Sequence, residues 1–113
     1  MEINMNLFKE KIKNLVIDLS NKNYKKIEIE KANGRINIMD LENAIKEYGK
    51  TIIPLAEEAF EIAHIYKIEK ENRMDIYMPL WTKEEGRSDL TLSILCYLKN
   101  NQPSIEINDL EVL

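Results

Sequence analysis

The sequence predicts an α+β protein in which N-terminal helices pack on one face of an antiparallel sheet of about four strands. Apolar residues in the first half recur at three- and four-residue steps, the spacing of helices with one buried side. In the second half they alternate with polar residues, the spacing of strands with one buried face. Short turns separate these strands, which makes neighbouring strands antiparallel. The length of 113 residues fits a single domain over residues 1–113.

Two helices are expected, one from about Asn4 to Ser20 and one from about Ile38 to Tyr48. Asn37 can cap the second helix, because its side chain can accept a hydrogen bond from a free backbone amide. Gly49 can end that helix with a positive φ. The apolar stripe of the first helix consists of Met5, Phe8, Ile12, Leu15, Val16 and Leu19.

The segments around the second helix are less regular. Residues 24–36 alternate in a way that fits either a short edge strand or an irregular connection, with a turn at Asn33-Gly34. Residues 51–54 read as an extended link, and Pro54 can begin a short helical segment that runs to about Phe60. We expect the chain to change to strand near Ile62, so that residues 64–68 are extended.

Three strands are predicted in the last part of the chain, over Arg73–Trp81, Asp89–Lys99 and Ser104–Val112. Pro79 has no backbone N–H to donate to a sheet, so we expect an edge or an irregularity there. The apolar phase of the last strand shifts by one between residues 107 and 110, which predicts a bulge near residues 108–109.

Composition excludes several kinds of chemistry. The single cysteine, Cys96, cannot form an internal disulfide, and this suits a cytoplasmic protein. With one histidine, His64, and one cysteine, the supply of ligands for a transition metal is poor. We therefore expect no metal, no cofactor and no catalytic residue. No apolar run approaches the roughly 20 residues of a membrane span, and the polar N-terminal stretch is unlike a signal peptide.

Charge is distributed unevenly along the chain. The net charge is −4, with 10 Lys/Arg against 8 Asp/Glu in residues 1–50 and 6 against 12 in residues 51–113. An acidic half repels phosphates and argues against nucleic acid as a partner. It favours a basic protein partner, because complementary charge speeds encounter, although acidity also keeps small proteins soluble.

One stretch is distinctive enough to carry a family resemblance. Residues 79–92, PLWTKEEGRSDLTL, resemble the hairpin of an uncharacterised bacterial domain family with a PLWT-x-EEGRSDLTL motif. Residues 44–49 (AIKEYG) and 107–113 (INDLEVL) are similar to two further places in that family. Small acidic α+β proteins of this type also look like the immunity proteins of bacterial toxin systems, an analogy of class and not of motif.

The same hairpin supplies the candidate site: Trp81, Glu84, Glu85, Arg87 and Asp89. In one reading these residues are structural, with the arginine bridging carboxylates and the tryptophan covering the base of the hairpin. In another they form an exposed anchor for a partner, since Trp and Arg are enriched at binding hot spots. A catalytic carboxylate pair is a third reading, which a solvated loop favours least.

We expect a non-enzymatic, cytoplasmic protein-binding module, in particular an immunity-type protein that blocks a cognate toxin by occluding its active site. A basic toxin domain such as a nuclease would match the acidic half. We expect this protein itself to bind neither nucleic acid nor a membrane. The alternative is a small-molecule-binding or enzymatic α+β cone with a pocket between helices and sheet. Its pocket candidates are His64, Tyr66, Tyr77, Arg87 and Tyr97. An accessory protein without separable activity is a third possibility.

Overall fold

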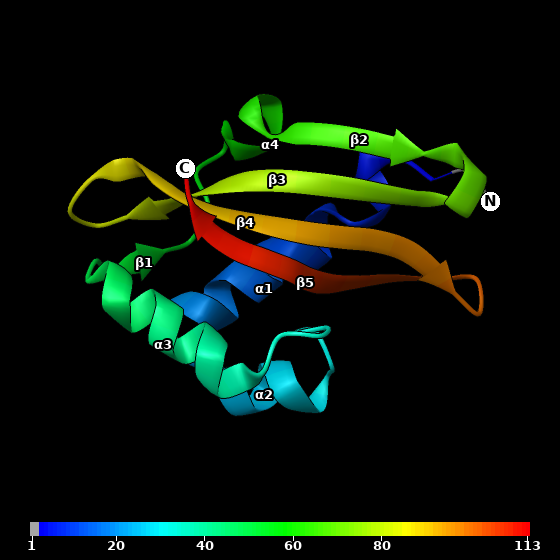
Figure 1. The fold of residues 1–113 in the computed structure, drawn as a ribbon. Coiled ribbons are helices and arrows are strands. Elements are labelled where there is room, and N and C mark those ends of the chain that lie inside the picture. The colour runs from blue at the N-terminus through cyan, green and yellow to red at the C-terminus, as the bar shows by residue number, and fades with distance from the viewer. Residues whose placement is uncertain (1–2) are drawn as a thin grey trace.

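The computed structural model describes residues 3–113 and confirms the α+β class, with the helices in the N-terminal half and the sheet in the C-terminal half (Figure 1). The helices are α1 (Lys9–Ser20), α2 (Tyr24–Ile29), α3 (Ile38–Tyr48) and α4 (Ala59–Ile62), with 3-10 turns η1 (Met5–Leu7) and η2 (Glu69–Glu71). The strands are β1 (Ile52–Ile53), β2 (His64–Ile68), β3 (Arg73–Thr82), β4 (Gly86–Lys99) and β5 (Gln102–Val112).

All strand pairs are antiparallel, and the sheet has five strands instead of about four. β4 lies between β3 and β5, while both β1 and β2 pair with β3. β2 pairs with residues 73–77 of β3 and β1 with residues 81–82, so the two short strands share one edge of β3. The predicted link at residues 51–54 therefore contains the extra strand, β1.

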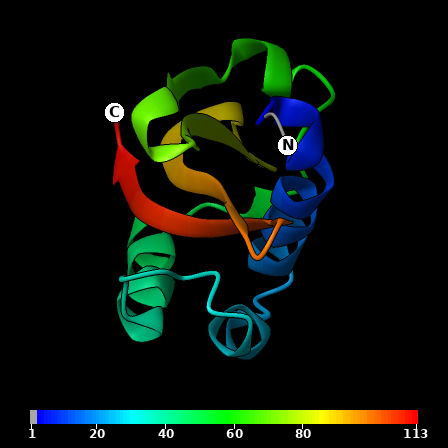
Figure 2. The same cartoon turned by 90° about the vertical axis from the view of Figure 1, so that its right-hand side faces the viewer.

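The core lies between the sheet and α1, which passes behind the sheet in Figure 1 and to its right in Figure 2. The predicted stripe is buried from Phe8 onward, while α1 itself begins later than expected, at Lys9, because residues 5–7 form η1. Among the buried side chains that the sheet contributes to the core are Ile52 of β1, Met74, Ile76, Met78 and Leu80 of β3, Leu90, Leu92, Ile94 and Cys96 of β4, and Ile107 of β5.

Residues 24–36 form neither a strand nor a fully irregular connection, because residues 24–29 are helix α2. Ile27 is buried, and Lys26 reaches back to the carboxylate of Asp18 on α1 at 3.1 Å. Such contacts between separate elements decide the conformation of a short segment against its own propensity. After α2, the carbonyl of Ala32 accepts a hydrogen bond from the backbone amide of Ile107 in β5 at 2.7 Å.

The boundaries of α3 are those the sequence predicts. The Asn37 side chain accepts a hydrogen bond from the amide of Met39 at 2.8 Å, and Gly49 ends the helix with φ 76°. The following helix, α4, begins at Ala59 and not at Pro54, and the change to strand falls at residue 63, next to the expected position.

Both predicted irregularities of the sheet are confirmed. The register of β3 against β4 shifts between Pro79 and Trp81. The register of β4 against β5 shifts between Ser93 and Ile94, which leaves Asn108 as the extra residue of a bulge. β4 and β5 both begin earlier than predicted, at Gly86 and Gln102, so the hairpin loop is shorter than the predicted residues 83–87.

Candidate functional site

The tip of the β3–β4 hairpin is fixed to the end of α3. The Glu84 carboxylate accepts two hydrogen bonds from Thr51, one from the backbone amide and one from the hydroxyl, each at 2.7 Å. These two hydrogen bonds lower the pKa of Glu84 below its ordinary value. The Tyr48 hydroxyl donates to Glu85 at 2.8 Å. Two of the five predicted site residues therefore hold the hairpin in place.

The other three predicted residues do not converge with them. Trp81 is only 8% exposed and belongs to the core, so the expectation of an exposed ring is wrong. Arg87 and Asp89 are exposed, and among residues 3–113 we find no ion pair that joins Arg87 to a carboxylate. The bridging expected of Arg87 is therefore also wrong, because Thr51 and Tyr48 bind the glutamates instead.

A second candidate surface is the sheet face that α1 does not cover. It faces the viewer in Figure 1, and we call it the open face. Its residues alternate along each strand with those that face the other way, and Pro79, Thr91 and Ser93 among them are buried. They are His64, Tyr66 and Ile68 of β2; Arg73, Asp75, Tyr77 and Pro79 of β3; Thr91, Ser93, Leu95 and Tyr97 of β4; and Ser104, Glu106, Asp109 and Glu111 of β5, with Asn108 from the bulge.

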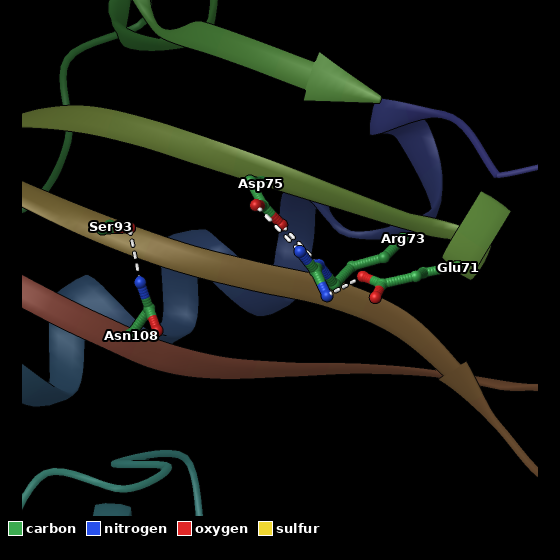
Figure 3. A network of polar contacts seen from close by, with 5 residues as sticks. All are labelled: Glu71, Arg73, Asp75, Ser93 and Asn108. Carbon is green, nitrogen blue, oxygen red and sulfur yellow. Dashed lines mark hydrogen bonds and ion pairs between the residues drawn. The ribbon is translucent and has the colours of Figure 1, made fainter. Parts of the chain in front are cut away.

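An arginine clamped between two carboxylates stands at one end of the open face (Figure 3). Arg73 donates from Nε to Asp75 at 2.7 Å and from its other side to Glu71. The hydrogen bond to Asp75 raises the pKa of Arg73 above its ordinary value. The cluster carries one positive and two negative charges, so it leaves the surface with a net negative charge.

Aromatic side chains occupy the β2 side of the open face. The rings of Tyr66 and Tyr77 meet edge to face with centroids 5.7 Å apart, and Tyr66 is 54% exposed. His64 lies directly opposite Tyr77 in the register of β2 and β3. It is exposed, which differs from the half-buried, hydrogen-bonded histidine that a lone His usually is. These rings provide apolar area that a partner could cover.

Acidic residues occupy the β5 side. Glu106, Asp109 and Glu111 all point to the open face, and Asp109 and Glu111 are exposed. The Tyr97 hydroxyl donates to Glu106 at 2.8 Å, which fixes that carboxylate on the surface. The Asn108 amide reaches Ser93 at 3.5 Å across the bulge (Figure 3). The open face thus combines exposed rings with a negative edge.

The structure does not gather the five pocket candidates of the alternative function. His64, Tyr66, Tyr77 and Tyr97 share the open face, while Arg87 lies toward the hairpin end of β4. None of the five lines any of the four surface depressions described for residues 3–113.

Cys96 is fully buried, and this burial raises the pKa of its thiol to about 12.

The sequence reading missed the charged residues of the open face, among them Arg73, Asp75 and Glu106. The signal was present, because these residues occupy the polar phase of the same alternation that predicts the strands. What the alternation could not supply is the order of the strands, which places the polar phases of β2, β3, β4 and β5 side by side.

The fold and the open face define an α+β protein with helices against one face of a five-stranded antiparallel sheet and a polar, partly aromatic opposite face. The chain belongs to the family described as Domain of unknown function (DUF7668), whose sequence model matches residues 16–113. No curated protein and no solved structure was found to match the chain. Within residues 3–113, no helix is long and apolar enough to cross a membrane.

Proposed function

We propose that this protein is a binding module for another protein, and in particular an immunity-type protein that neutralises a cognate bacterial toxin by covering its active site. The observation that carries the proposal is the open face, which presents exposed rings beside the acidic side chains of Glu106, Asp109 and Glu111. Tyr is enriched at binding hot spots, and acidic groups at the rim speed encounter with a basic partner.

The proposed mechanism is occlusion without turnover. Tyr66 and Tyr77 supply apolar contact, and the β5 carboxylates face the basic residues that a nuclease uses to hold phosphates. Arg73 keeps Asp75 and Glu71 in fixed positions, so little side-chain entropy is lost when a partner binds them.

Growth rescue tests the proposal. The candidate for the toxin gene is the gene directly upstream of the one that encodes this protein. That gene is expressed alone and together with this protein in a bacterial host, and colony counts are compared. We expect the upstream product to kill and this protein to restore growth. The double variant Glu106→Lys/Asp109→Lys should abolish rescue, whereas Glu57→Lys, which reverses an exposed acid in the segment before α4, should not.

Two results would contradict the proposal. A non-toxic upstream product would remove the immunity role. Rescue that survives the double reversal together with Tyr66→Ala would place the interface elsewhere. If no protein partner binds but a small molecule raises the melting temperature, the pocket alternative replaces the proposal, since binding to the folded state alone stabilises it.

A further inference from the structure

A second surface lies at the outer edge of β5, next to the open face. β5 is the last strand on its side of the sheet, and α3 runs below it in Figure 1. Midway along β5 this edge is covered, because the amide of Ile107 donates to the carbonyl of Ala32. Beyond the bulge, no backbone hydrogen bond among residues 3–113 joins residues 109–112 to α3 or to the segment after α2.

The outward backbone amides of this edge belong to Leu110 and Val112. The amide of Leu113 donates to the carbonyl of Asp89 on β4 at 3.0 Å. Successive amides of a strand point to opposite sides, so the amides of Val112 and Leu110 point away from β4. The Leu110 amide is met only by its neighbour's side chain, Asp109 Oδ1 at 2.8 Å. The Val112 amide has no partner among residues 3–113, and an outward amide without a partner is a place where a further strand can pair.

A depression of about 390 Å³ adjoins this edge, between α3 and the ends of β4 and β5. Ala44, Leu90, Leu110 and Val112 supply its apolar lining, and Val112 is 61% exposed. The charged residues that line it are Glu47 and Glu111, and no basic residue does so. A strand added to β5 would place alternate side chains over this apolar floor and others beside the two carboxylates.

We infer that the β5 edge over residues 109–112, with the adjoining depression, binds an extended segment of a partner protein in which apolar and basic residues alternate. Charge complementarity selects this occupant, since Glu47 and Glu111 favour basic side chains. A second copy of this chain fits poorly, because pairing two β5 strands would bring Asp109 and Glu111 of each copy close together. The inference rests on the proposed protein-binding function and uses a surface that adjoins the open face and shares Asp109 and Glu111 with it.

A synthetic peptide tests the inference without knowledge of the partner. The probe is an acetylated, amidated heptapeptide of alternating Lys and Val, titrated into the ¹⁵N-labelled protein while amide shifts are recorded. We expect saturable shifts at residues 109–113 and on the side of α3 around Ala44 and Glu47. The same peptide with alternate backbone amides N-methylated should bind at least tenfold more weakly, and a Glu/Val peptide should not bind.

A matched pair of variants separates backbone pairing from side-chain packing. Val112→Pro removes an amide that points away from β4, so the fold should persist, whereas Val112→Ala keeps that amide. We expect Val112→Pro to weaken peptide binding at least tenfold and Val112→Ala only a few fold. Glu111→Lys leaves the backbone intact and should also weaken peptide binding. It replaces Val112→Pro as the test if the proline variant unfolds.

Several outcomes overturn the inference. These are the absence of amide shifts at millimolar peptide concentration, shifts confined to β2 and β3, and equal binding of the N-methylated peptide. If Val112→Pro leaves toxin neutralisation unchanged while Tyr66→Ala with Glu106→Lys, both outside residues 109–112, abolishes it, the strand-addition site fails and the proposed function stands. If the peptide binds at β5 but no toxin is neutralised, the proposed function fails and the strand-addition site stands.

Discussion

The burial of Trp81 gives a quantitative prediction about the hairpin. The side chain is 8% exposed and packs in the core, where its strand pairs with β1 on one side and β4 on the other. Replacing a buried Trp with Ala costs about 3–5 kcal/mol, because burial is lost and a cavity remains. Since the free energy of unfolding of such domains is about 5–15 kcal/mol, Trp81→Ala should remove a large part of the stability.

Urea unfolding followed by far-UV circular dichroism measures this loss. Fluorescence is unsuitable, because Trp81 is the single tryptophan of the chain. Trp81→Phe is the control, since it keeps a ring in the same position and should lose less than half as much stability. A loss below about 1 kcal/mol for Trp81→Ala, with an unchanged denaturant slope, would refute the reasoning and show that the ring does not support the core.

Three further predictions concern single groups. Gly34 has φ +56°, and a Cβ there would lie 2.5 Å from the carbonyl oxygen of Ile107. Gly34→Ala should therefore lower the free energy of unfolding, measured in urea, by more than the roughly 1–2 kcal/mol that a left-handed residue alone costs. A smaller loss of stability would contradict the close approach. Hydrogen bonds from Thr51 lower the pKa of Glu84, so the stability they give is present above the unfolded-state pKa and lost as pH falls through the folded-state pKa. Glu84→Gln should make the free energy of unfolding fall less steeply as the pH is lowered. An unchanged pH dependence would exclude a contribution of the Glu84 hydrogen bonds to stability. Because burial raises the pKa of Cys96 to about 12, its thiol should resist iodoacetamide at pH 8 in the folded protein and react once unfolded; fast labelling of the native state would contradict its burial.

The sequence predicts those parts of the fold that local chemistry decides. The caps of α3, the strand character of β2 to β5 and the bulge at Asn108 all follow from residue types within a few positions. Pro79 marks an irregularity because its missing N–H is a local property. The α+β class follows from the change of apolar period along the chain.

The rest depends on contacts between residues far apart in the sequence. Helix α2 forms where Lys26 meets Asp18 and Ile27 enters the core, although its alternating residues equally fit a strand. Glu84 binds Thr51, 33 positions away, and no spacing rule predicts that pair. For the same reason the sequence identified the acidic half of the chain but did not show which of its carboxylates share the open face.

The central claim, that the open face receives a basic protein partner, is tested most directly by association kinetics. The purified product of the upstream gene is mixed with this protein in a stopped-flow instrument at low and high salt. Screening should slow association of the wild type as salt rises. We predict that Glu106→Lys/Asp109→Lys lowers the association rate at low salt and removes most of its salt dependence, while Glu57→Lys leaves both nearly unchanged. Equal association rates and salt slopes for the wild type and both variants would contradict the account.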